Sequence, residues 1–106
     1  MCGFVGFVGS YSQKKLSLAN EILSHRGPDE TGIWISESGC VGLAHKRLSI
    51  IDLSPSGSQP MSSQKGNEIL VFNGEIYNFE ELRANLQDKG VVFRGQSDTE
   101  VLLEYL

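Results

Sequence analysis

Two short apolar runs separated by a tight polar turn limit the folds that are open to this chain. Residues 33–36 read Ile-Trp-Ile-Ser and residues 41–45 read Val-Gly-Leu-Ala-His, with the turn Glu37 to Gly39 between them. Two strand-like runs joined by so short a turn are typical of a β-hairpin, whose strands are antiparallel. Together with the helices described below, the pattern predicts an α+β fold built on antiparallel sheet.

The N-terminal segment predicts a further strand followed by a helix. Residues 3–9 are apolar throughout, and we expect a strand that is covered on both faces. The glycines of this run indicate close approach by a ligand or another backbone, although a glycine-rich strand packed under a helix fits equally well. Residues 14–24 have helical spacing of their apolar side chains, which predicts an amphipathic helix with this stripe in the core: Leu16, Ala19, Ile22 and Leu23.

Three further apolar runs follow along the chain. The run at 48–53 precedes a segment with Pro55 and Gly57, which predicts a loop over residues 54–58. The runs at 69–72 and 91–93 predict a buried strand and a short strand. Antiparallel sheet with helices on it is therefore expected throughout.

Two helix-start signals complete the pattern. Asn78 and Ser97 are each followed three residues later by a glutamate, which predicts a capping box at both positions. The first helix is expected to end at Gly90. The second has apolar residues that still need packing partners where the sequence stops, which favours an incomplete domain: Leu102, Leu103, Tyr105 and Leu106.

The composition argues against several classes of function. The chain has 106 residues, a net charge of -4 and a pI near 5.0. It therefore lacks the basic face that neutralises nucleic-acid phosphates. No apolar stretch is long enough to span a membrane, and the apolar start lacks the charged lead-in of a signal peptide. We expect a cytoplasmic domain that binds neither nucleic acid nor membrane.

The two cysteines indicate neither a disulfide scaffold nor a metal site. Cys2 and Cys40 are too few for a scaffold and are not in metal-ligand spacing with His25 or His45. Removal of the initiator Met1, however, would leave Cys2 with a thiol and a free α-amino group on one residue. Such a pair serves as nucleophile and base together. The alternative is that Cys2 is a small buried hydrophobe of the first strand.

Several motifs together resemble one known family. Their order and spacing are similar to those of the glutaminase domain of asparagine synthetases, a class II glutamine amidotransferase domain and N-terminal nucleophile hydrolase. The resemblance covers the whole chain, and the run Phe-Asn-Gly-Glu-Ile-Tyr-Asn is typical of the asparagine synthetase branch. The motifs are Cys2-Gly3, His25 to Asp29, Arg47 to Asp52, Gln59-Pro60-Met61, Phe72 to Asn78 and Ser97 to Glu100.

The resemblance implies the fold and the extent of the domain. Residues 1–106 would be the N-terminal portion of a four-layer αββα sandwich with antiparallel sheets. This portion is an incomplete class II glutamine amidotransferase domain, from which the synthetase domain is absent. We therefore expect the rest of the sandwich to lie outside these residues.

Recognition of free glutamine requires a cation for its carboxylate and anions for its ammonium group. Arg47 can bind the α-carboxylate through its planar guanidinium fork, which suits a carboxylate better than the neighbouring Lys46 does. The resemblance implies that Glu75 and Asp98 hold the ammonium group. It also implies that the backbone after Arg47 lines the carboxylate end of the pocket: Leu48, Ser49, Ile50 and Ile51.

The carboxamide of glutamine requires an oxyanion hole. The resemblance implies that Asn73 supplies its side-chain amide and Gly74 its backbone N–H. On their own these two residues fit a turn equally well. Arg47 alone also fits a surface residue at a strand start, and Asp98 fits a helix-terminal acid that suits the helix dipole.

Three further features are assigned supporting roles. We expect the loop from His25 to Asp29 to shape the site without taking a step in the reaction. The family uses no histidine base, so His45 is expected to be a structural histidine with its hydrogen bonds satisfied. Cys40 is expected to be a core residue.

The implied reaction is the hydrolysis of glutamine to glutamate and ammonia. Cys2 would attack the carboxamide, its own α-amino group would manage the proton, and water would release glutamate from the thioester. In the full-length family the ammonia passes to a synthetase domain or subunit that activates aspartate with ATP and Mg, and a homodimer is expected. This sequence has no Ser-Gly-Gly-x-Asp-Ser pyrophosphate loop, so no cofactor is expected to bind to it.

Other hypotheses remain at this point. One is a truncated amidotransferase that binds glutamine or a partner subunit without turnover. Another is an amidotransferase whose ammonia serves cell-surface polysaccharide biosynthesis. The weakest is a thiol redox protein built on Cys2 and Cys40, since Cys-x-x-Cys is absent.

Overall fold

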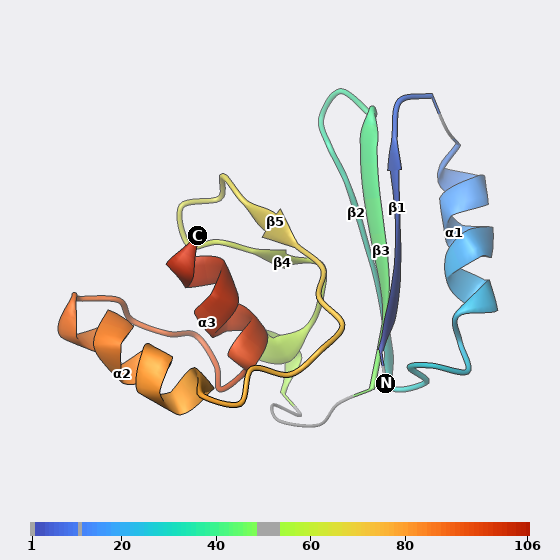
Figure 1. The fold of residues 1–106 in the computed structure, drawn as a ribbon. Coiled ribbons are helices and arrows are strands. Elements are labelled where there is room, and N and C mark those ends of the chain that lie inside the picture. The colour runs from blue at the N-terminus through green and yellow to red at the C-terminus, as the bar shows by residue number, and fades with distance from the viewer. Residues whose placement is uncertain (1, 11, 49–53) are drawn as a thin grey trace.

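The chain folds into a three-stranded sheet with one helix on it and a second group of short elements beside that sheet (Figure 1). The computed structural model describes residues 2–10, 12–48 and 54–106. The sheet unit contains β1 (Gly3–Val8), α1 (Gln13–Ile22), β2 (Glu30–Ile35) and β3 (Val41–Arg47). The second unit contains η1 (Pro55–Gly57), β4 (Met61–Ser62), β5 (Ile69–Leu70), α2 (Phe79–Asp88) and α3 (Asp98–Tyr105).

The sheet has the strand order β1-β3-β2, and every pairing in it is antiparallel. Gly3 pairs with Lys46 at one end of β1, and Val8 pairs with Val41 at the other. The predicted hairpin is confirmed as β2 and β3. Its turn is tight, because Gly39 adopts a φ of 76°, a backbone region that glycine enters without strain.

Helix α1 covers one face of this sheet. Ser12 caps its N-terminus by accepting a hydrogen bond from the backbone N–H of Lys15. Leu16 and Asn20, one turn apart, are its buried residues. The predicted stripe is wrong at Ile22, which is 75% exposed, because it lies two residues beyond Asn20 and thus on another side of the helix.

Strand β1 is not covered on both faces, contrary to the prediction. Its exposure alternates along the strand, and Phe4 and Val8 are 49% and 87% exposed. Side chains alternate across a strand, so only one of its two sets of side chains points toward α1. The sheet contacts the second unit at His45 and at Gly32, which are paired neighbours in β3 and β2.

The second unit has less regular structure than the pattern predicts. Residues 55–57 form a turn of 3-10 helix within the expected loop, and β5 ends at Leu70 instead of Phe72. Residues 91–93, all of them described, form neither strand nor helix. This segment contacts α2: the backbone N–H of Val91 donates to the carbonyl oxygen of Leu86 at 3.0 Å, and the ring of Phe93 lies 4.4 Å from the guanidinium of Arg83.

The two predicted capping boxes have different outcomes. Ser97 accepts from the backbone N–H of Glu100, as expected, and opens α3. Asn78 precedes α2, but its side chain makes no capping hydrogen bond in the described structure. Leu103 is only 2% exposed and is therefore packed, whereas Leu106 at the end of the chain is 77% exposed.

Glu100 has a role that its capping pattern does not predict. The side chain is completely buried, and its two oxygens accept from the backbone N–H groups of Arg94 at 2.8 Å and Gly95 at 2.9 Å. The carboxylate thus holds the irregular segment that precedes α3. The α+β class with antiparallel sheet is confirmed. In the described ranges, helices are all too short or too polar to cross a bilayer.

Candidate active site

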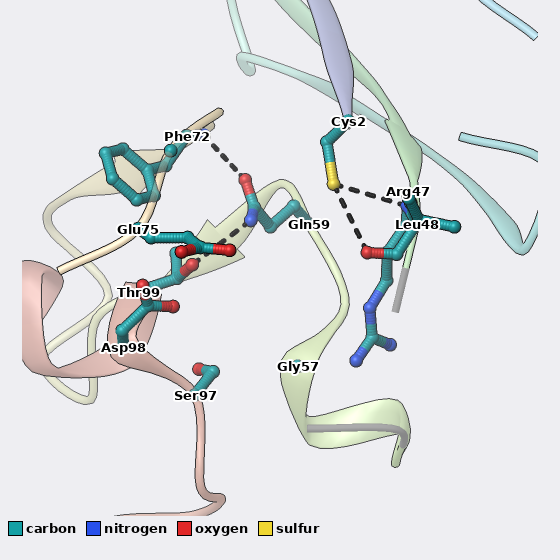
Figure 2. Close-up of a pocket in the computed structure, with 11 residues that line it drawn as sticks. Cys2, Arg47, Leu48, Gly57, Gln59, Phe72, Glu75, Ser97, Asp98 and Thr99 are labelled. Atoms are coloured by element: carbon teal, nitrogen blue, oxygen red, sulfur yellow. Dashed lines mark hydrogen bonds between the residues drawn. The ribbon is translucent and has the colours of Figure 1, made fainter. Parts of the chain in front are cut away.

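A cleft lies between the sheet unit and the second unit, and it gathers residues from distant parts of the sequence (Figure 2). We call the part formed by Cys2, Arg47 and Leu48 the nucleophile wall. The opposite part, formed by Gly74, Glu75 and Asp98, is called the acidic wall. The complete lining consists of Cys2, Arg47, Leu48, Gly57, Gln59, Phe72, Gly74, Glu75, Ser97, Asp98 and Thr99.

Cys2 is held at the end of β1 by contacts on both its side chain and its backbone. The backbone N–H of Leu48 donates to the sulfur at 3.2 Å, and the sulfur lies 3.5 Å from the carbonyl oxygen of the same residue. Nε of Arg26 donates to the carbonyl oxygen of Cys2 at 3.0 Å. The thiol is half-buried and free, at the edge of the cleft.

The loop from His25 to Asp29 ties this end of β1 to the end of β3. Besides the contact of Arg26 with Cys2, the N–H of Asp29 donates to the carbonyl oxygen of Arg47 at 2.9 Å. A Cβ atom at Gly27 would lie 2.3 Å from the carbonyl oxygen of Lys46, so the loop backbone packs directly on the strand. These contacts give the loop a structural route to shape the site.

Arg47 lines the cleft with its side chain already engaged. Its Nη1 donates to Glu30 Oε2 and to the carbonyl oxygen of Ser54, both at 2.9 Å. Burial tends to raise the pKa of Glu30, but the hydrogen bonds from Ser58 and Arg47 and the Arg47 charge outweigh it and hold that pKa below its usual value. A ligand carboxylate would therefore share the guanidinium with Glu30, which a group with five N–H donors allows.

The acidic wall places two carboxyl groups opposite Cys2 and Arg47. Figure 2 shows Glu75 extending across the cleft and Asp98 below it. Asp98 is 6% exposed, and its Oδ2 accepts from the backbone N–H of Ile76 at 2.9 Å. One cation and two acidic groups thus face a common space, an arrangement that complements a zwitterionic ligand.

Residues 72–74 approach the cleft without regular secondary structure. The N–H of Phe72 donates to Gln59 Oε1 at 2.6 Å, and Nε2 of the Gln59 amide donates to Oγ1 of Thr99 at 3.3 Å. The φ angles of Asn73 and Gly74 are not positive, since the described positive-φ residues lie elsewhere. Gly74 is nonetheless tightly placed, because a Cβ there would lie 2.9 Å from the Phe72 ring.

Most of the predicted site residues come together. Of the assigned set, the cleft gathers Cys2, Arg47, Leu48, Gly74, Glu75 and Asp98. Asn73 is half-buried between two lining residues but does not itself line the cleft. The predicted contacts of Ser49, Ile50 and Ile51 lie outside the described residues.

Sequence reasoning missed several residues that build the site. Gln59 lies in the motif Gln59-Pro60-Met61, and Arg26 lies in the loop from His25 to Asp29. The sequence assigned neither residue a contact in the site. Glu30 gave no signal of its own. The motifs could have indicated Gln59 and Arg26, because a polar side chain in a motif without a reaction step is a candidate for holding another residue.

The prediction that Cys40 is a core residue is wrong, and the prediction that His45 is a structural histidine with its hydrogen bonds satisfied holds only in part. Cys40 is exposed, because it lies in the turn between β2 and β3. It flanks the opposite end of the paired strands from Cys2, so the two thiols do not form a redox pair. His45 is completely buried, as a structural residue would be, but only partly satisfied.

The contacts of His45 explain its charge state. Its Nε2 lies 3.4 Å from the carbonyl oxygen of Phe72, and within the described part of the chain Nδ1 has no hydrogen-bond partner. Burial lowers the pKa of His45 and outweighs the hydrogen bond with Phe72, which raises it; the nearby Arg47 charge lowers the pKa further, and the Glu30 charge raises it slightly. The neutral ring with its proton on Nε2 therefore fits this place. Among the described residues no cluster of metal-binding side chains occurs.

Comparison with known proteins agrees with this arrangement. The chain is 46% identical over 90 residues to amidase chry2 of Gibberella zeae, a match that covers 85% of this chain and 13% of that protein. It is 43% identical over 110 residues to glutamine-hydrolyzing asparagine synthetase 1 of Bacillus subtilis, covering 97% of this chain and 17% of the relative. For asparagine synthetase B of Escherichia coli the identity is 43% over 91 residues, with 86% and 16% covered.

The chain thus spans less than a fifth of the length of these curated relatives. A family model described as a glutamine amidotransferase domain matches residues 1–106. Because this match extends over the whole chain, the protein belongs to the glutamine amidotransferase domain family.

Proposed function

We propose that this domain hydrolyses glutamine to glutamate and ammonia, with Cys2 as the nucleophile. The observation that carries the proposal is the cleft itself, in which a half-buried thiol and an arginine face two acidic groups. This is the complement of glutamine, whose carboxylate, ammonium group and carboxamide need a cation, anions and a nucleophile. Family membership and the similarity to glutamine-hydrolyzing asparagine synthetases support the same reaction.

The proposed mechanism assigns one step to each group. After removal of Met1, the α-amino group of Cys2 accepts the thiol proton, and the sulfur attacks the carboxamide carbon. Asn73 and Gly74 stabilise the negative charge on the carboxamide oxygen. The C–N bond then breaks, the proton passes from the amine to the leaving nitrogen, and ammonia departs. Water hydrolyses the thioester, which yields glutamate and restores the thiol.

Substrate recognition is assigned to the charged groups. Arg47 binds the α-carboxylate through a guanidinium that Glu30 and Ser54 hold in place. Glu75 and Asp98 bind the ammonium group. Leu48, the described residue next to Arg47, also lines the cleft, and we assign its backbone to the carboxylate end of the ligand. No metal ion or organic cofactor is needed for this step, so ATP and Mg are assigned to a synthetase domain beyond these residues.

The ammonia acceptor is proposed from the relatives. Two of the relatives described above are glutamine-hydrolyzing asparagine synthetases, which favours aspartate as the acceptor in the full-length protein. The amidase chry2 of Gibberella zeae is similar to a comparable degree and is not named as an asparagine synthetase, so we keep an amidotransferase with another acceptor as the second candidate. Formation of asparagine from aspartate, ATP and glutamine supports the first. Glutamine hydrolysis without asparagine formation supports the second.

The decisive test of the hydrolysis uses Cys2→Ala in the full-length protein. We expect glutamate release to fall by at least about 10³-fold, the order of loss seen when a catalytic nucleophile is removed. Glutamine binding measured by calorimetry should persist, because Arg47, Glu75 and Asp98 remain. Cys40→Ala is the matched control and should keep full activity, since this thiol is exposed at the hairpin turn.

A second variant tests the role of the α-amino group. An alanine inserted between Met1 and Cys2 leaves the thiol in the chain but turns the amine into an amide. Hydrolysis should be lost while the melting temperature stays the same. Full activity of this variant, or of Cys2→Ala, contradicts the proposed mechanism.

A further inference from the structure

We propose that Gln59 and His45 are positioning residues, which hold the backbone of Phe72 and thereby set the geometry of the Asn73-Gly74 oxyanion element. The inference rests on the proposed function, because it assigns the support of an element whose catalytic role is itself proposed. Neither residue is given a reaction step, and both act through Phe72.

The oxyanion element lies in a segment that has no strand or helix to fix it. The structure between β5, which ends at Leu70, and α2, which begins at Phe79, is irregular. Backbone N–H and C=O groups that leave the ladder of a sheet need other partners when they are buried. For Phe72, the residue directly before Asn73, both groups are bonded to side chains.

Gln59 holds the first of these groups and His45 the second. Gln59 Oε1 accepts from the Phe72 N–H at 2.6 Å, and His45 Nε2 lies 3.4 Å from the Phe72 carbonyl oxygen. Gln59 is 8% exposed and His45 is completely buried, so water does not compete strongly for either contact. The carbonyl of Phe72 and the N–H of Asn73 belong to one planar peptide unit, so the orientation of one fixes the other.

Gln59 is in turn fixed on two sides. Its amide nitrogen donates to Thr99, the neighbour of Asp98 on α3 (Figure 2). Its own carbonyl oxygen sits so close to Gly32 of β2 that a Cβ there would lie 1.8 Å away. Gln59 therefore contacts the sheet through its backbone, and its side chain links the oxyanion segment to the helix that carries Asp98.

Asp98, one of the two acidic residues of the cleft, holds the other end of the oxyanion segment. Asp98 Oδ2 accepts from the N–H of Ile76, two residues after Gly74. The segment from Phe72 to Ile76 is thus fixed at both ends, and Gln59 connects the two ends through Thr99. A polar frame of this kind preorganises hydrogen-bond donors, which is the property that an oxyanion hole requires.

The test compares kcat, KM and thiol reactivity in the full-length protein. Gln59→Met removes both hydrogen bonds of the amide at similar length, and we expect kcat to fall by roughly tenfold or more, since a small misplacement of catalytic groups is costly. KM should change less than kcat. Gln87→Met, on the exposed side of α2, is the matched control and should leave both constants unchanged.

His45 is tested by one disruptive and one conservative change. His45→Leu removes the donor to Phe72 and should lower kcat, whereas His45→Gln keeps an amide N–H in reach and should restore most of it. Alkylation of Cys2 by iodoacetamide forms no oxyanion, so its rate should be the same in all these variants. An equal loss of hydrolysis and alkylation would overturn the inference, because it would mean that the thiol itself had moved.

A double-mutant cycle with Asn73→Ala separates this inference from the proposed function. If Gln59 acts through the oxyanion element, Gln59→Met should lose most of its effect on kcat in the Asn73→Ala background. Multiplicative effects of the two changes would overturn the positioning role and leave the proposed function standing. An Asn73→Ala variant with unchanged kcat would overturn the catalytic assignment of the element itself, and the positioning role with it.

Discussion

The two walls of the cleft are built by different kinds of hydrogen bond. On the nucleophile wall, Cys2 directly precedes β1 and Arg47 is the last residue of β3, and backbone pairing joins these two strands from Gly3 with Lys46 to Val8 with Val41. On the acidic wall, Gly74 and Glu75 lie in an irregular segment, and side chains such as Gln59 and Asp98 hold its backbone. The first wall depends on groups that every residue possesses, and the second depends on particular side chains.

This difference teaches where each wall is vulnerable. A ladder of backbone hydrogen bonds does not depend on the side chains, so it tolerates most substitutions. The exceptions are glycines on which another segment of the chain packs directly. A segment held by single buried side chains loses its support when one of them is replaced, because buried donors are then left unsatisfied. We therefore expect the sheet to be sensitive at its close-contact glycines and the acidic wall at its buried polar residues. Three experiments can break or sharpen this contrast.

The largest effect on stability is expected where the sheet unit and the second unit touch, at Gly32 and Gln59. In Gly32→Ala the new Cβ would lie 1.8 Å from the carbonyl oxygen and 2.8 Å from the carbonyl carbon of Gln59. Because backbone cannot yield as a flexible side chain does, we expect a loss of about 3 kcal/mol in the free energy of unfolding, measured by urea denaturation. Gly6→Ala is the control, since its closest neighbour is the mobile Leu43 side chain at 3.1 Å. Similar losses for both glycines would contradict the role of backbone contact.

The next effect tests a single buried side chain of the second unit. Glu100→Gln keeps the shape of the residue but replaces one acceptor oxygen by an amide group. One of the N–H groups of Arg94 and Gly95 then loses its partner, at a cost of roughly 2 kcal/mol in unfolding free energy. Glu80→Gln, in the exposed first turn of α2, should change the same quantity by less than about 0.5 kcal/mol. Equal values for the two variants would mean that the carboxylate of Glu100 does not hold the segment.

The smallest effect concerns pH and the buried histidine that joins the two units. The pKa of His45 is below its ordinary value of 6.5 in the folded chain, so the unfolded chain binds a proton first as the pH falls. Stability should be complete above about pH 6.5 and decrease below it, with a slope of up to roughly 1.4 kcal/mol per pH unit until the folded pKa is reached. Thermal melting between pH 5 and 7 measures this slope.

The control for this experiment is His45→Gln, which does not titrate and should flatten the pH profile. Glu21 and Glu30, the hydrogen-bonded partners of Lys46 and Arg47, also have lowered pKa values, but from an ordinary value of 4.5. Their contributions are present above that value and decrease at lower pH, outside the window of His45. A slope that persists in His45→Gln would assign the effect to another group.

The elements with strong local patterns could be predicted from the sequence. The hairpin of β2 and β3, the strand β1 and the helices α1, α2 and α3 follow from periodicity, turn residues and caps. The assignments of Cys2, Arg47 and Asp98 to one site depended on the family resemblance. All three residues line the same cleft, which agrees with the resemblance. Their roles in the reaction stay predictions.

The remainder depends on contacts between residues that are distant in the sequence. The Ser97 capping pattern predicts that Glu100 bonds back to its own helix start, but the carboxylate turns to Arg94 and Gly95 instead. The expected strand at 91–93 is wrong because an apolar run cannot show whether a partner strand exists. Likewise, no local pattern indicates that the side chain of Gln59 accepts a hydrogen bond from Phe72, because the fold of the intervening residues brings the two together.

The anchoring of Cys2 has a consequence for the entropy of the reaction. The first residues of a chain ordinarily sample many conformations, and a nucleophile placed there would have to be immobilised each time a substrate arrives. Arg26 holds the Cys2 carbonyl and Leu48 contacts its sulfur, so this ordering is completed when the domain folds. In the proposed mechanism, folding thereby raises the effective concentration of the thiol at the cleft before any glutamine is bound.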